Sequence, residues 1–169
     1  MSIAVVGLGN LILSDEGVGV HVVRRLAEAY SFPAEVALID GGTSAIDLLD
    51  QLVDAEHIIF VDAAQTGGPP GSIVALQGAR LPVWFRQRMS PHQIGLADLL
   101  ATLSLMDHAP DSVTLIGIAP LSMELGTELS PIVDTAADEA RDKVVETLAA
   151  LGVHAIARGT VRAGAMPCA

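Results

Sequence analysis

The stretch Val6-Gly-Leu-Gly-Asn-Leu-Ile-Leu-Ser-Asp-Glu-Gly-Val-Gly19 decides the fold. The apolar run over residues 3–6 leads into it and predicts a buried strand. The glycine pair that follows predicts a tight turn, and the adjacent acids Asp15 and Glu16 open a helical pattern. A strand, a turn and a helix in this order are typical of an α/β domain whose site lies beyond the carboxyl end of the strand.

A nucleotide-binding module is one alternative for this stretch. Gly7-x-Gly9 matches the first half of a dinucleotide-binding fingerprint, but Ile12 stands where the third glycine belongs. Asp40 resembles the ribose-binding acid, although its spacing from the glycines is longer than the usual twenty or so residues. The two adjacent acids also put negative charge where a pyrophosphate needs a helix amino terminus free of it. The match is therefore partial, and the acids need another explanation.

The composition is that of one globular domain. The 169 residues are 51% hydrophobic and 17% charged, which favours a packed core over a disordered chain. The net charge of −11 argues against a nucleic-acid partner, which needs a basic surface. No apolar run reaches the roughly 20 residues that span a bilayer, so we expect no membrane insertion. The single cysteine, Cys168, excludes an internal disulfide and favours a cytoplasmic location.

Apolar runs and helical periods alternate along the chain and predict one domain over residues 1–157, followed by a flexible tail over 158–169. Strands are expected at 3–6, 35–39, 57–61, 72–76 and 112–119. Helices are expected at 15–30, at 44–53 with Ile46 inward, and from Pro91 and Pro131 onward. The short link before the fourth strand allows it to run antiparallel at a sheet edge.

Acidic and glycine residues follow the second and third expected strands. Asp40-Gly-Gly-Thr43 follows the second strand, and its glycines suit either a βα turn or close approach of a bound peptide or ligand. Asp62 follows the third strand, where it is either a turn acid or a functional group. In a doubly wound sheet of order 2-1-3, the first and third strands are neighbours at the switch point. We therefore expect Asp62 beside the loop that carries Glu16.

The segment Ser90-Pro-His-Gln93 predicts a helix start, with serine as N-cap, proline at the first helical position and Gln93 in a capping box. His92 then occupies the second helical position, where the helix dipole favours a neutral imidazole able to bind metal. A lone histidine is also often structural. With Glu16 and Asp62, His92 would supply two carboxylates and one imidazole, a ligand set that suits a transition metal with open positions.

These blocks together resemble the hydrogenase maturation endopeptidases, which trim the carboxyl-terminal extension from the large-subunit precursor of nickel–iron hydrogenases. The matching segments are 7–10, 13–19, 40–43, 61–63, 90–98 and 129–131, and the resemblance runs from residue 1 to about 157. It implies a three-layer α/β/α fold with a mostly parallel, twisted, five-stranded mixed sheet. It also implies a metal-dependent peptide hydrolase of aspartyl or metallo type.

The resemblance further implies the roles of individual residues. Glu16, Asp62 and His92 would be the catalytic and metal-binding residues. The residues that would line the substrate cleft are Asp40, Gly41, Gly42 and Thr43. The metal would be nickel already lodged in the hydrogenase large-subunit precursor, and no organic cofactor is implied. A non-catalytic nickel chaperone or assembly scaffold for hydrogenase is the second alternative, and it predicts nickel transfer without a change in precursor mass.

Two acidic positions have no assigned role at this level. The family often carries acids within a few positions of the residue that matches Pro120, whereas here Leu121 follows directly and Glu124 comes later. Asp15 either caps the helix, supports the site, or does both. The sequence shows no Ser–His–Asp order and no activated cysteine, which disfavours a nucleophilic mechanism, and it leaves the general base undecided.

Overall fold

The computed structural model describes residues 1–78, 81 and 91–158, and a five-stranded sheet of order β3-β1-β4-β6-β5 forms its centre. The strands are β1 (Ile3–Leu8), β3 (Val36–Gly42), β4 (His57–Ala63), β5 (Ile73–Gln77) and β6 (Ser112–Ile118). Neighbouring strands are parallel, except that β5 runs antiparallel to β6 at the edge. The predicted mixed sheet is confirmed. Strand β1 lies between β3 and β4, which are the second and third strands expected along the chain, as the doubly wound order requires.

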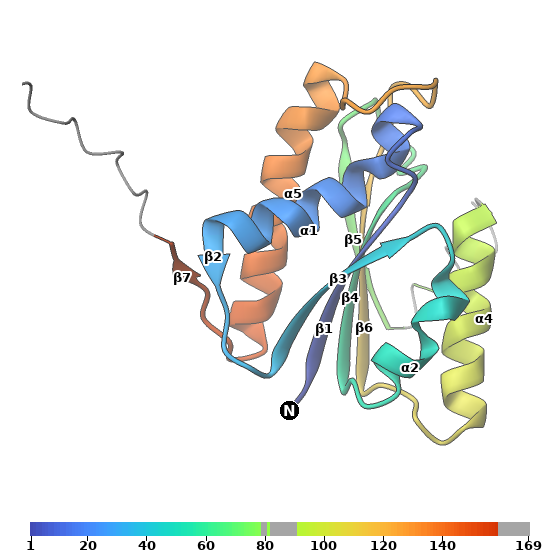
Figure 1. Cartoon of the computed structure of the whole chain (residues 1–169), viewed down its shortest axis with the longest axis vertical. Helices are drawn as coiled ribbons and strands as arrows, with labels where there is room; N and C mark the ends of the chain where they lie inside the picture. The colour runs from blue at the N-terminus through green and yellow to red at the C-terminus, as the bar shows by residue number, and fades with distance from the viewer. Residues whose placement is uncertain (79–80, 82–90, 159–169) are drawn as a thin grey trace, which may run out of the picture.

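Helices cover both faces of this sheet (Figure 1). They are α1 (Val18–Ala29), α2 (Leu49–Leu52), α4 (Pro91–Leu105) and α5 (Pro131–Ala150). Side chains alternate along β1, so Ile3 and Val5 enter the core under α1 and α5, while Val6 and Leu8 enter the core under α2 and α4. The three-layer α/β/α architecture is therefore confirmed. No helix of the described ranges is long and apolar enough to cross a membrane.

The helix expected over 44–53 forms two short pieces, the 3-10 turn η2 (Ala45–Leu48) and the single turn α2. The expectation that Ile46 faces the core is wrong, because this side chain is 45% exposed. A 3-10 helix has about three residues per turn, so Ala45 and Leu48 share one face. Both are buried against the sheet, and Ile46 consequently lies on the outer side.

Strand β3 extends beyond the expected 35–39 and includes the residues that the sequence assigns to a turn. Its pairing with β1 shifts by one residue after Asp40, which leaves Gly41 as the extra residue of a bulge. A Cβ atom on Gly41 would lie 2.8 Å from the Leu8 side chain. Gly42 has a φ of 54°, a conformation that favours glycine. Core packing and backbone conformation thus account for the two glycines.

A two-stranded sheet that the sequence does not predict joins the end of α1 to the end of the described chain. Its strands are β2 (Tyr30–Ser31) and β7 (Ile156–Ala157), which pair antiparallel. The Arg158 amide donates to the Ala29 carbonyl at 2.8 Å, and its Nε donates to the Tyr30 carbonyl. Residues 159–169 of the expected tail lie outside the described residues, so the domain boundary at 157 stays a prediction.

Candidate active site

Glycines allow the loop that carries Glu16 to lie directly on the ends of the central strands. A Cβ atom on Gly7 would lie 2.2 Å from the Gly19 carbonyl oxygen, and one on Gly19 would lie 2.1 Å from that of Val61. Gly9 has a φ of 134°, and a Cβ there would lie 1.9 Å from the Glu16 carbonyl oxygen. No real side chain tolerates such distances. Close backbone packing therefore explains these glycines without a bound phosphate.

Glu16 and Asp62 come from segments that meet at one edge of the sheet. Glu16 belongs to the 3-10 turn η1 (Ser14–Gly17), which contacts β4. Asp62 is the penultimate residue of β4 and pairs with Gly117 of β6. Asp62 is fully buried, whereas Glu16 is partly exposed. Two carboxylate residues therefore lie at the carboxyl ends of parallel strands, the place where doubly wound sheets bind ligands.

His92 is the second residue of α4, which begins at Pro91 as the sequence predicts. Its side chain, like the whole of Ser90, lies outside what the structure describes. Within the described part, no three His, Cys, Asp or Glu side chains form a group able to hold a metal ion. A metal site formed by Glu16, Asp62 and His92 therefore stays a prediction.

The segment expected to line the cleft borders the same loop. The Gly9 amide donates to the Gly42 carbonyl at 2.8 Å, which fastens the end of β3 to the glycine turn after β1. Asp40 is half-exposed and forms an ion pair with Arg24 at 3.1 Å, and Thr43 is exposed. This placement suits a wall of a cleft, and the contact with substrate stays a prediction.

Asp15 is buried and fully hydrogen-bonded. Its Oδ2 accepts hydrogen bonds from the amides of Leu121 and Ser122, both at 2.9 Å, and from the Ser130 hydroxyl at 2.8 Å. Its Oδ1 accepts from the Ser130 amide at 2.7 Å. Burial alone raises the pKa of this carboxyl, but the bonds from Ser130, Ser122 and Leu121 outweigh burial and hold the pKa below its ordinary value. Asp15 is therefore an ionised, buried acid.

The Ser130 hydroxyl does not serve its own helix. Ser130 is the N-cap of α5 as predicted, and Pro131 follows at the first helical position, but no side-chain capping bond forms. Because the hydroxyl donates to Asp15 instead, Asp15 satisfies donors at the start of α5, more than a hundred residues away. Of the two adjacent acids, Asp15 is therefore structural and Glu16 is the candidate site residue.

A groove of about 510 Å³, here called the groove beside Asp62, lies where the chain leaves β4 and β6. It begins at Ala64, two residues after Asp62, and Asp62 itself is not among the described residues that line it. It is lined by Ala64, Gln65, Thr66, Gly67, Gly68, Pro70, Ala119, Pro120, Leu121 and Met123. Sequence reasoning identifies none of these as site residues, because loops of glycine, proline and scattered apolar residues carry no chemical signature. Their position at the carboxyl ends of the strands makes them candidates for contact with a substrate chain.

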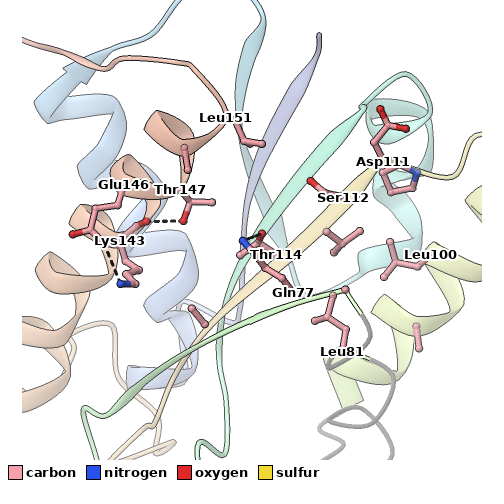
Figure 2. A pocket seen from close by; sticks show the side chains of 16 residues that line it. Gln77, Leu81, Leu100, Asp111, Ser112, Thr114, Lys143, Glu146, Thr147 and Leu151 are labelled. Atoms are coloured by element: carbon pink, nitrogen blue, oxygen red, sulfur yellow. Dashed lines mark hydrogen bonds and ion pairs between the residues drawn. The ribbon is translucent and has the colours of Figure 1, made fainter.

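A larger cavity, of about 1080 Å³, lies at the other end of β6 and is lined from both α4 and α5 (Figure 2). Among its lining residues, the Gln77 amide donates to the Thr114 hydroxyl at 3.0 Å. Figure 2 marks this hydrogen bond with a dashed line. Ser112, at the amino end of β6, also lines it. This cavity is therefore remote from Asp62 along the strand direction, and neither Glu16 nor Asp62 is among the described residues that line it.

Comparison with known proteins finds relatives among the hydrogenase maturation proteases. A family model described as hydrogenase maturation protease matches residues 20–147. The hydrogenase 2 maturation protease of Escherichia coli K12 is 36% identical over 162 residues, which are 95% of this chain and 99% of that protein. The structure of the E. coli hydrogenase maturating endopeptidase HybD matches with a TM-score of 0.88 and 37% identity, over 94% of this chain and 98% of that one. The NiFe hydrogenase maturation protease HybD from Thermococcus kodakarensis matches with a TM-score of 0.76 and 27% identity, over 88% and 99%.

Proposed function

Because the chain belongs to the hydrogenase maturation protease family, we propose that it removes the carboxyl-terminal extension of a nickel–iron hydrogenase large-subunit precursor after nickel insertion. The observation that carries this proposal is the meeting of η1, with Glu16, and the end of β4, with Asp62, at one sheet edge. The groove beside Asp62 offers room there for an extended peptide. We place this reaction in the cytoplasm, because a chain with a single cysteine forms no internal disulfide and such bonds are rare in cytoplasmic proteins.

Nickel enters this proposal as part of the substrate. Glu16, Asp62 and His92 contact the ion that the precursor carries, and their two carboxylates and one imidazole suit a divalent transition metal. In this proposal the partly exposed Glu16 can meet an incoming surface directly, whereas the fully buried Asp62 reaches the ion only after the residues around it move apart. An empty precursor lacks the ion and so lacks these contacts. The peptidase itself then needs no permanent ion and no organic cofactor.

Hydrolysis in this proposal uses water as the nucleophile. A carboxylate of the set, or the ion that it contacts, orients a water molecule against the scissile carbonyl. The water oxygen attacks the carbonyl carbon and the carbon–nitrogen bond breaks. The proton that the water gives up passes to the leaving amine, and the acyl fragment is released as a carboxylic acid. Both an aspartyl-type and a metallo-type route are compatible with these residues. In this proposal the substrate chain contacts the segment from Asp40 to Thr43 and the groove beside Asp62.

The test is incubation of the purified protein with nickel-loaded and nickel-free precursor, followed by mass spectrometry. We expect only the loaded precursor to lose its extension. Glu16→Gln, Asp62→Asn and His92→Ala should each abolish or sharply reduce cleavage. Asp50→Asn, which changes an exposed acid on α2, is the matched control and should leave cleavage unchanged.

The outcomes separate the parts of the proposal. Equal cleavage of loaded and nickel-free precursor contradicts nickel-dependent recognition. Cleavage of neither contradicts the protease assignment, and nickel transfer without a change in mass favours the chaperone alternative. Normal cleavage by one of the three site variants removes that residue from the site.

A further inference from the structure

We propose that Asp15 is a positioning residue, which clamps the loop that carries Glu16 to the segment over residues 121–130 and so fixes Glu16 in the candidate site. The inference rests on the proposed function of Glu16. Asp15 is fully buried and both of its carboxylate oxygens are occupied by hydrogen bonds from the protein. It is therefore placed to hold the site together without touching substrate.

The clamp joins parts of the chain that are distant in sequence. The four hydrogen bonds that Asp15 accepts come from positions 106 to 115 residues further along the chain. Their lengths run from 2.7 to 2.9 Å, the range of hydrogen bonds to an ionised carboxylate, which are roughly twice as strong as neutral ones. Removing this acceptor would leave several donors at the start of α5 and in the preceding loop unsatisfied.

The backbone of Asp15 and of the preceding residue, Ser14, extends this clamp into a longer seam of hydrogen bonds with residues 122–126. The Ser14 amide donates to the Gly126 carbonyl at 2.8 Å, and the Ser14 hydroxyl donates to the Glu124 carbonyl at 2.9 Å. The Asp15 amide donates to the Ser122 carbonyl at 3.1 Å. Ser14 has a φ of 49°, which is rare for a residue other than glycine and persists only where surrounding contacts enforce it. Glu124 thus contributes its backbone carbonyl to the seam.

Glu16 depends on this seam because its own turn is short. The 3-10 turn η1 has four residues and no side-chain capping bond. Close packing on Gly9 supports Glu16 from the strand side, and the bonds of Asp15 hold the adjacent backbone from the side of α5. The clamped segment also presents Leu121 and Met123 to the groove beside Asp62. Releasing the clamp would therefore shift Glu16 relative to Asp62.

The first test compares three variants in the cleavage of nickel-loaded precursor. Asp15→Asn keeps the side-chain volume, removes the charge, and replaces one acceptor oxygen by an NH2 group that faces other hydrogen-bond donors. Ser130→Ala removes one of the four hydrogen bonds. Asp134→Asn is the matched control, because Asp134 lies in the first turn of the same helix but pairs with Arg25. Since a misplacement of about 1 Å can cost roughly 100-fold in rate, we expect Asp15→Asn to lower kcat at least about tenfold, with KM changed much less. Ser130→Ala should lower kcat by a smaller factor, and Asp134→Asn should not lower it.

The second test reads the clamp directly by nuclear magnetic resonance, at a temperature where circular dichroism shows every variant folded. In Asp15→Asn, the amides of Leu121 and Ser122 should exchange with solvent faster. In Ser130→Ala, whose changed residue is far from Glu16 in sequence, the Glu16 amide resonance should shift. Asp134→Asn should produce neither change. A merely stabilising acid would lower the melting temperature without the loss of kcat and without the shift at Glu16.

A folded Asp15→Asn protein with wild-type kcat, together with an unshifted Glu16 resonance in Ser130→Ala, overturns the proposal. If Asp15→Asn does not fold, Ser130→Ala decides in the same way, with wild-type kcat and an unshifted resonance as the contrary result. Failure of the proposed function looks different, because the wild-type protein would then leave the loaded precursor uncut. In that case the exchange rates and the Glu16 resonance still report whether the clamp exists.

Discussion

Replacing Gly19 by alanine should destabilise the protein, because this residue lets α1 rest on the sheet backbone. The new Cβ atom would lie 2.1 Å from the Val61 carbonyl oxygen and 2.4 Å from that of Leu8. These oxygens belong to two central strands and cannot rotate away as a side chain would. The start of α1 must therefore lift from the sheet by about 1 Å, against a core that is packed as densely as a crystal.

The size of the effect follows from two opposing contributions. Overpacking of a well-packed core costs roughly 1–3 kcal/mol, and Gly19 belongs at the upper end since only backbone surrounds it. Alanine is a better helix former than glycine by about 1 kcal/mol, which offsets part of this cost. We therefore expect the free energy of unfolding to fall by about 2 kcal/mol or more.

Urea unfolding followed by circular dichroism measures this change. With a slope of about 2 kcal/mol per molar urea, the midpoint should fall by about 1 M while the slope stays constant. Gly95→Ala is the matched control within α4, because its Cβ would lie 3.6 Å from the Ala45 side chain, an ordinary contact. Its midpoint should stay unchanged or rise. A wild-type midpoint for Gly19→Ala, or an equal loss in both variants, would refute the close-packing argument.

Two further predictions concern pH and backbone conformation. Burial, and then the charges of Arg25 and Arg24, hold the pKa of His21 below its ordinary value of 6.5, so its neutral form favours the fold and stability falls as the pH drops below about 6.5. His21→Gln should weaken this decrease in thermal melts between about pH 7.5 and pH 5.5, and an unchanged pH dependence would contradict it. Gly152 has a φ of 85° after the end of α5 with open space around it, so Gly152→Ala should cost about 1 kcal/mol by strain alone, whereas Gly152→Asn should cost less. Equal urea midpoints for the alanine variant and the wild type would contradict this reading.

The sheet could be predicted from sequence because its signals are local. The run His57–Val61 is apolar on both faces, as a central parallel strand requires, and the acid that follows it marks the strand end. Ser130-Pro131 predicts the start of α5 by the same local chemistry. Given those elements, the doubly wound order placed Asp62 and the Glu16 loop at one edge, and the structure agrees.

The rest depends on contacts that no local pattern encodes. The partners of Asp15 lie more than a hundred positions away, so its structural role is invisible in the stretch that contains it. In sequence, Gly7 looks like a turn glycine and Gly19 lies inside the expected helix over 15–30. Each is needed because backbone from another element approaches closely. Ile46 is exposed because a 3-10 turn replaces the expected α-helix, a difference of period that a short apolar pattern cannot distinguish.

The proposed processing of a hydrogenase large subunit by this protein can be tested in cells. The most direct measurement is the intact mass of the nickel–iron hydrogenase large subunit isolated from cells with and without this protein. We expect the subunit to keep its carboxyl-terminal extension when the protein is absent and to lose it when the protein is restored. A large subunit of the same mature mass in both kinds of cell would contradict the proposed processing.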